Sequence, residues 1–164
     1  MDRPAYRSPR TSPARIRQSV SASPAADSVR LMLAVSQGAF AEMIAQAYAC
    51  YPEEGCGLLV GHPGRGTVVR FVACENVTHS GKVYSIAPKD LLRAERNAED
   101  EGMEVIGVMH SHTHTEPYPS PTDVNQAPDP TWHYVIVSLK RESPEARSYL
   151  LVDGTISEEA IAVG

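Results

Sequence analysis

The stretch MHSHTHTEPYPSPTD, residues 109–123, decides how the rest of the chain is interpreted. It follows an apolar run at 105–108 that is typical of a buried strand, and it opens with His110 and His112. Side chains two residues apart on an extended segment point to the same face, so both imidazoles can approach one ion. Asp123 adds a carboxylate, and zinc takes both kinds of ligand in proteins. The stretch therefore predicts a metal site, with the histidines carried off the end of a strand at 104–109.

The same stretch also fits the start of a helix. Ser120 is a good N-cap, Pro121 suits the first helical position, and Asp123 falls at the third, where its carboxylate can reach back to the cap. This interpretation explains Ser120 and Asp123 without a metal, but it does not explain two histidines directly after a buried strand. Because the two interpretations are compatible, we expect both to hold.

The composition indicates one globular domain and excludes several functions. The chain has 164 residues, 42% hydrophobic and 21% charged, which is enough to build one core. Its net charge of −5 argues against a nucleic-acid partner, because such proteins need a basic surface. Three cysteines without a CxxC motif favour a reducing compartment, and no apolar run is long enough to span a membrane. We therefore expect a cytoplasmic protein that binds neither nucleic acid nor membrane.

The local patterns predict a tail and one domain. Residues 1–28 are rich in Ser, Pro and Arg and are expected to be disordered, and the domain is expected at 29–164. Strands are predicted at 29–35, 55–61, 67–73, 104–109, 132–139, 147–152 and 155–161, and helical segments at 38–50, 88–100 and 123–127. This order predicts an α+β domain in an α/β/α-like, three-layer arrangement, with a mixed β-sheet of about six to eight strands flanked by helices.

Three protein ligands leave the fourth position of a tetrahedral zinc open, which is the pattern of a catalytic site. A water activated there needs a base, and Glu54 is the candidate because it directly precedes an apolar strand, whereas Glu53 is expected to face solvent. Ser120 could donate its hydroxyl to an oxyanion, in addition to its role as a cap. Cys56 is expected to be a buried thiol rather than a ligand.

Together these residues resemble the JAMM (MPN+) metalloproteases. The resemblance rests on Glu54 before Gly-Cys-Gly at 55–57, and on His-Ser-His at 110–112 followed by Ser120 and Asp123 at fixed spacing. It covers roughly 29–163 and implies a JAMM/MPN (cytidine-deaminase-like) domain that binds one Zn²⁺. By the resemblance, His110, His112 and Asp123 would be the metal ligands, Glu54 the general base and acid, and Ser120 the oxyanion stabiliser.

The runs at 110–124, 132–138 and 147–159, together with Asn76 and Tyr84, are similar to an actinobacterial branch of this family, the CysO-cysteine peptidases. That similarity implies hydrolysis of the amide bond between cysteine and the C-terminal glycine of a ubiquitin-like sulfur carrier (CysO/ThiS/MoaD-like, ending in Gly-Gly). The products would be free cysteine and the regenerated carrier.

Three questions stay open in the sequence. A related JAMM peptidase could instead process a carrier for siderophore or thio-metabolite synthesis, and a non-catalytic MPN scaffold would bind proteins without cleaving them. Segment 76–86 is either an exposed edge that pairs with the extended Gly-Gly tail or a plain connecting loop. A homodimer is compatible with the sequence.

Overall fold

The described part of the computed structural model, residues 32–62 and 64–164, contains seven strands and three helices. The predicted tail and the first residues of the first predicted strand, 29–31, lie outside the described residues. In chain order the elements are β1 (Met32–Val35), α2 (Gln37–Cys50), β2 (Cys56–His62), β3 (Thr67–Cys74), α3 (Pro88–Asp100), β4 (Glu104–His112), α4 (Pro121–Gln126), β5 (His133–Ser138), β6 (Glu145–Val152) and β7 (Thr155–Val163).

The strands form one mixed sheet in the order β1-β3-β2-β4-β5-β6-β7. At its centre, β4 runs antiparallel to β2, with His110 opposite Cys56, and parallel to β5, with His110 opposite Ile136. β1 pairs in parallel with both β3 and β7, so the first strand closes the sheet on itself. A mixed sheet of this size was predicted, whereas its closure was not.

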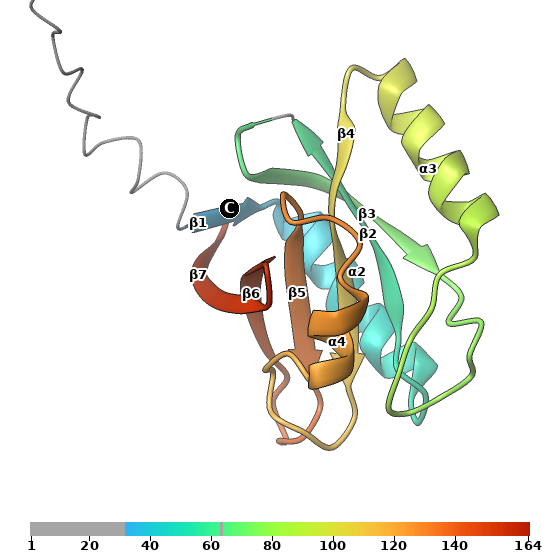
Figure 1. Cartoon of the computed structure of the whole chain (residues 1–164), viewed down its shortest axis with the longest axis vertical. Helices are drawn as coiled ribbons and strands as arrows, with labels where there is room; N and C mark the ends of the chain where they lie inside the picture. The colour runs from blue at the N-terminus through green and yellow to red at the C-terminus, as the bar shows by residue number, and fades with distance from the viewer. Residues whose placement is uncertain (1–31, 63) are drawn as a thin grey trace, which may run out of the picture.

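Helices cover both faces of the central strands (Figure 1). Leu58 and Leu59 of β2 point to opposite faces, because side chains alternate along a strand. Leu59 packs with the buried face of α2, behind the sheet in Figure 1, while Leu58 packs with Ala94 of α3. Val124 of α4 packs against Val108 on the same side as Leu58. The three-layer α+β prediction is therefore confirmed.

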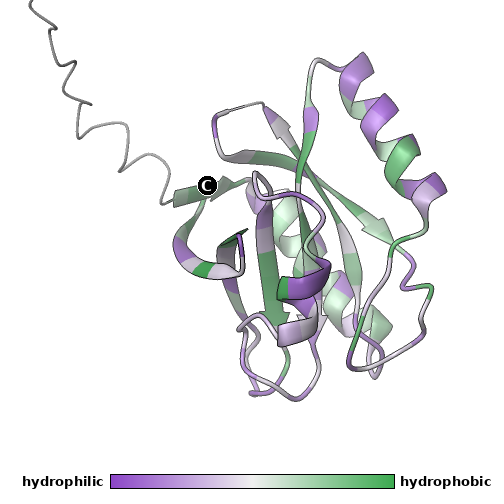
Figure 2. Cartoon of the chain, in the orientation of Figure 1, coloured by the Kyte–Doolittle hydropathy of each residue, from purple (hydrophilic) through white to green (hydrophobic). Residues whose placement is uncertain are grey.

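The two longer helices, α2 and α3, meet the sheet through a narrow stripe of small or apolar residues. α2 buries Ala39, Met43 and Ala47, and α3 buries Ala94 and Ala98. The rest of α3 is largely hydrophilic, as Figure 2 shows. No helix among the described residues is both long enough and apolar enough to cross a membrane.

The predicted end of β4 at residue 109 was wrong. Pairing with β5 continues through Ser111 opposite Val137 and His112 opposite Ser138. Both histidines therefore lie inside the hydrogen-bonded sheet and not beyond its edge. The backbone of each is fixed by neighbouring strands, which makes the site more rigid than one built on a loop.

Segment 76–86 forms no strand in this structure, which favours the second of the two alternatives, a connecting loop. Asn76 is buried, and its side-chain amide donates to the carbonyls of Glu54, Ser80 and Val83. Its side-chain oxygen accepts from the amide of Ser85 at 3.1 Å. The bonds to the Val83 carbonyl and the Ser85 amide occupy backbone groups that an added strand would need. A backbone group that is already paired inside the protein is less available to pair with another chain.

Candidate active site

Three side chains of the kinds that bind zinc meet on the sheet face covered by α3 and α4. The Nε2 atoms of His110 and His112 lie 3.2 Å apart, and the carboxylate oxygens of Asp123 lie 3.4 Å from the first and 3.6 Å from the second. All three ligand atoms fall within 4.8 Å of one another, and no other such triplet occurs in residues 32–62 and 64–164. Two imidazoles and a carboxylate facing one point fit a zinc ion, and the structure brings together all three predicted ligands.

A capping box at the start of α4 aims Asp123. The side-chain oxygen of Ser120 accepts from the amide of Asp123 at 3.2 Å, and Oδ2 of Asp123 accepts from the amide of Ser120 at 2.7 Å. Pro121 occupies the first turn, where its missing N–H costs nothing. The predicted helix start and the predicted metal ligand therefore coexist, and the cap holds the carboxylate toward the histidines.

Burial and hydrogen bonding set the charges of the three ligands. Burial lowers the pKa of His110, which favours the neutral ring that a metal needs. Burial also lowers the pKa of His112, but hydrogen bonds to Asp123 and to the carbonyl of Glu116 outweigh it, so this pKa is raised overall. Burial raises the pKa of Asp123, but hydrogen bonds with the two histidines hold it well below its usual range. Of the two imidazoles, His112 therefore holds its proton more tightly than His110.

Different contacts orient the two rings. Nδ1 of His112 donates to the carbonyl of Glu116 at 2.7 Å, which directs Nε2 toward Asp123. Nδ1 of His110 is buried and has no hydrogen-bond partner among the described residues. The ring of Tyr84 instead stacks on His110, with centroids 4.5 Å apart and planes 17° apart. Packing against Tyr84 therefore holds the ring of His110, and the carbonyl of Glu116 holds the ring of His112.

Glu54 lies close enough to the ligands for their charges to act on it. Its side chain is only 4% exposed, and burial raises the pKa of its carboxyl to about 7, with the charge of His112 lowering that pKa and the charge of Asp123 raising it. Glu53 faces outward, as the sequence predicted, and it contacts His79 at 3.3 Å. A carboxyl with a pKa near neutral pH can both accept and return a proton, so Glu54 has the properties of a general base.

Ser111, the middle residue of His-Ser-His, links β4 to Gly55, the residue directly before β2. No pattern in the sequence marks Ser111 as a functional residue. Its side-chain oxygen accepts from the amide of Gly55 at 2.8 Å, and its own amide donates to the carbonyl of Gly55 at 2.9 Å. A Cβ at Gly55 would lie 2.9 Å from the carbonyl oxygen of Gln46 in α2. The residue after Glu54 must therefore be small, and it is fixed against the ligand strand.

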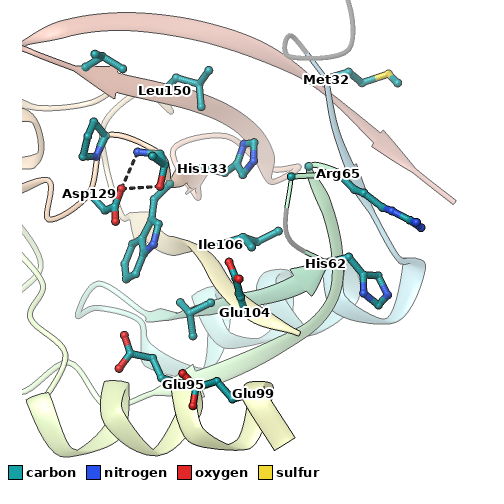
Figure 3. A pocket seen from close by; sticks show the side chains of 17 residues that line it. Met32, His62, Arg65, Glu95, Glu99, Glu104, Ile106, Asp129, His133 and Leu150 are labelled. Carbon is teal, nitrogen blue, oxygen red and sulfur yellow. Dashed lines mark hydrogen bonds between the residues drawn. The ribbon is translucent and has the colours of Figure 1, made fainter. Parts of the chain in front are cut away.

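A large cleft among the described residues does not contain this site. It has a volume of about 960 Å³ and lies at the opposite end of β4, where its nearest lining residue on the strand, Ile106, is roughly 20 Å from His112 at ~3.3 Å per residue. Its walls include Glu95, Glu99, Glu104 and His133, which Figure 3 shows spread around an open space. A second cleft of about 250 Å³ borders Asp123 and is lined by Tyr84 and Trp132 among others. The chemistry therefore lies beside the smaller cleft.

Cys56 is the buried thiol that the sequence predicted. Its side chain is fully buried, and burial raises its pKa to about 12, so it stays protonated. It is not part of the metal triplet.

The fold defines an α+β domain of the JAMM/MPN class, and its site brings together three side chains that could hold a metal ion. The chain belongs to the family described as prokaryotic homologs of the JAB domain, whose model matches residues 36–152.

Two curated relatives and two solved structures illustrate what the chain is similar to. The CysO-cysteine peptidase of Mycobacterium tuberculosis is 38% identical over 122 residues, 74% of this chain and 84% of that protein. The desampylase of Pyrococcus furiosus is 34% identical over 111 residues, 67% of this chain and 76% of that protein. A solution structure of a protein from Desulfitobacterium hafniense has a TM-score of 0.75 and 31% identity, covering 81% and 93% of the two chains. A JAB1/MPN domain protein from Archaeoglobus fulgidus has a TM-score of 0.53 and 21% identity over 79% and 99%, which shows the shared fold.

Proposed function

We propose that this chain is a zinc-dependent peptidase that hydrolyses the amide bond between cysteine and the C-terminal glycine of a ubiquitin-like sulfur carrier. The observation that carries the proposal is the grouping of His110, His112 and Asp123, whose ligand atoms lie within 4.8 Å of one another, with the buried carboxyl of Glu54 close enough for their charges to act on it. Three protein ligands are the set that a catalytic zinc site would use. The relative named CysO-cysteine peptidase supports the substrate class.

Zinc, when bound, polarises the scissile carbonyl and lowers the pKa of a water molecule. Glu54 accepts the proton of that water and returns it to the leaving amine of cysteine, which its pKa near neutrality permits. The oxygen of Ser120 already accepts from Asp123, so its hydroxyl proton remains available for the oxyanion that develops on the carbonyl.

The cleft beside Asp123 is our candidate for the path of the carrier's tail. Tyr84 and Ile86 of segment 76–86 and Gln126 of α4 line it, together with Asp123. A Gly-Gly terminus has no side chains, so it suits a narrow entrance between packed residues. The tail would therefore lie between segment 76–86 and α4 instead of adding a strand to the sheet.

Two further properties complete the proposal. Cys50, Cys56 and Cys74 are all free, which fits the reducing cytoplasm that we propose as the location. A homodimer stays a prediction, to be checked by light scattering coupled to size-exclusion chromatography.

Cleavage of carrier–protein conjugates is a second candidate. Relatives from Pyrococcus furiosus and Thermus thermophilus are named desampylase and probable TtuB-protein conjugate cleaving protease. Processing of a carrier for siderophore or thio-metabolite synthesis uses the same chemistry and differs only in the partner. A non-catalytic scaffold is disfavoured, because every ligand and the candidate base are present.

The decisive experiment incubates the zinc-loaded protein with a carrier–cysteine conjugate and follows the intact mass of the carrier. Loss of the cysteine mass, absent in Glu54→Gln and in zinc-stripped protein, is the expected result. A parallel reaction with a carrier joined to a lysine side chain of a protein tests the second candidate. An unchanged conjugate mass, with one zinc per chain measured in the same sample, would refute the peptidase on this substrate.

A further inference from the structure

The orientation of the metal ligand His112 depends on one backbone carbonyl, that of Glu116. This carbonyl accepts from Nδ1 of His112 at 2.7 Å and from the amide of Tyr118 at 2.8 Å. The second bond closes a three-residue turn around Pro117, whose ring fixes its backbone. The position of that turn therefore decides whether Nδ1 of His112 has a partner.

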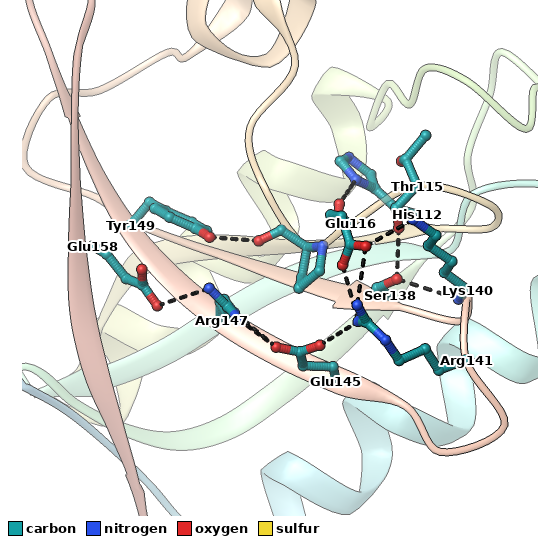
Figure 4. A network of polar contacts seen from close by, with 11 residues as sticks. His112, Thr115, Glu116, Ser138, Lys140, Arg141, Glu145, Arg147, Tyr149 and Glu158 are labelled. Carbon is teal, nitrogen blue, oxygen red and sulfur yellow. Dashed lines mark hydrogen bonds and ion pairs between the residues drawn. The ribbon is translucent and has the colours of Figure 1, made fainter.

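Two buried hydroxyl groups hold the turn from the sheet. The side chain of Ser138, at the end of β5, donates to the carbonyl of Thr115 at 2.6 Å, and the phenol of Tyr149, in β6, donates to the carbonyl of Pro117 at 2.5 Å (Figure 4). Ser138 is 2% exposed and Tyr149 is 1% exposed. The two anchored carbonyls flank Glu116 on both sides, so the strands fix the carbonyl between them.

An ion-pair network lies over the same turn on the surface. The carboxylate of Glu116 contacts Lys140 at 2.7 Å and Arg141 at 2.9 Å, and Arg141 continues to Glu145 (Figure 4). These side chains are about half exposed, at 45% for Lys140 and 55% for Arg141. Exposed pairs of this kind contribute little because water screens them. The buried hydroxyls, not the surface charges, therefore carry the positioning.

We propose that Ser138 and Tyr149 are positioning residues for the metal site, acting through the Glu116 carbonyl to keep His112 protonated on Nδ1 and open on Nε2. A neutral imidazole carries one proton on either nitrogen, and a proton on Nε2 blocks the atom that faces the metal. The inference rests on the zinc site of the proposed function and concerns residues outside its ligand set.

Tyr134 is a matched control for Tyr149. The two tyrosines stand directly opposite each other on β5 and β6, pack in the same cluster and are almost fully buried. The phenol of Tyr134 also donates to a backbone carbonyl, but that of Asp129 at 2.6 Å, which lies outside the turn. Tyr149→Phe and Tyr134→Phe each remove one hydroxyl and leave the ring, so both should fold. Because the Tyr134 hydroxyl also accepts from the amide of Asp129 at 3.1 Å, Tyr134→Phe should lose at least as much stability as Tyr149→Phe.

The test measures zinc affinity by competition with a chelator, on wild type and four variants. Ser138→Ala/Tyr149→Phe should bind zinc about tenfold more weakly, since a direct partner of a metal-bound histidine typically contributes 10–100-fold and these residues act one step further out. Tyr149→Phe alone should lose about threefold, whereas Tyr134→Phe and Arg141→Ala should stay within about twofold of wild type. On metal-free protein at alkaline pH, the ¹⁵N shifts of His112 should move from one tautomer to a mixture in the double variant and not in Tyr134→Phe.

Each outcome decides the question. Unchanged affinity and unchanged His112 shifts in the double variant would overturn the positioning role while leaving the proposed function intact. An equal loss in Tyr134→Phe and Tyr149→Phe would overturn it too, because the effect would then be general destabilisation. A wild-type chain that binds no zinc would overturn the proposed function and this inference together.

Discussion

Glu54→Gln is expected to stabilise the metal-free protein and nearly abolish its activity. A carboxyl whose pKa is raised by folding holds its proton more tightly in the folded state, so its ionisation opposes folding. The loss of folding free energy that this ionisation causes is absent below the usual pKa of 4.5, grows as the pH rises and reaches its full size above about 7. The interval between these two pKa values corresponds to roughly 3 kcal/mol.

Glutamine keeps the shape of the side chain and cannot ionise. Chelator-treated Glu54→Gln should therefore be more stable than wild type by up to about 3 kcal/mol at pH 8 and equal to it at pH 4. Urea unfolding at the two pH values measures this difference. Turnover of the zinc-loaded variant should fall by about 10²–10⁴-fold, because the general base is lost.

Glu53→Gln is the matched control. This neighbouring carboxylate is partly exposed and contacts His79, so the same substitution should change stability by less than about 0.5 kcal/mol and leave turnover unchanged. The reasoning fails in its electrostatic part if Glu54→Gln gains no stability at pH 8. It fails in its catalytic part if the zinc-loaded Glu54→Gln protein turns over within about threefold of wild type.

Three further predictions concern the metal, the cap and the packing of the site. Zinc affinity should fall by about tenfold per pH unit below the raised pKa of His112, since zinc displaces its proton, and calorimetry in two buffers should detect that proton's release. The same proton stabilises the metal-free fold, fully at pH values below about 6.5 and not at all once the pH exceeds the raised pKa. Lowering the pH through this range should therefore raise the unfolding temperature of the metal-free protein and reduce the further rise that zinc produces. Ser120→Ala should destabilise the protein by about 1 kcal/mol through the lost cap on Asp123, and should lower kcat about 10²–10³-fold with little change in KM. Gly55→Ala should cost about 1–3 kcal/mol in urea unfolding, because the added methyl meets the Gln46 carbonyl at 2.9 Å.

The site could be predicted from the sequence because its parts are local. The two histidines are two residues apart on a strand, and Ser120 and Asp123 are three apart at a helix start, so strand and cap geometry place both pairs. Glu54 required the resemblance to the JAMM metalloproteases as well, because a glutamate before a strand is usually solvated surface. Its role as a base stays a prediction.

The features of the site and fold that the sequence did not predict depend on contacts between residues that are distant in the chain. Tyr84 stacks on His110 across 26 positions, and Tyr149 reaches Pro117 across 32. No periodicity links such pairs, since they depend on how the sheet closes and which loop covers which strand. The end of β4 was misplaced for the same reason: pairing with β5 extends the strand, and that partner is not visible in the local pattern.

The register between β2 and β4 has a consequence for how the protein matures. Cys56 stands opposite His110, and a slip of one residue would turn both histidines to the α2 face of the sheet. A chain paired in the wrong register would keep its strands and still be unable to hold an ion. Metal present during refolding would therefore shift the equilibrium toward molecules with the correct register, because only these bind it. A preparation with normal strand content and less than one ion per chain would reveal the fraction that had paired wrongly.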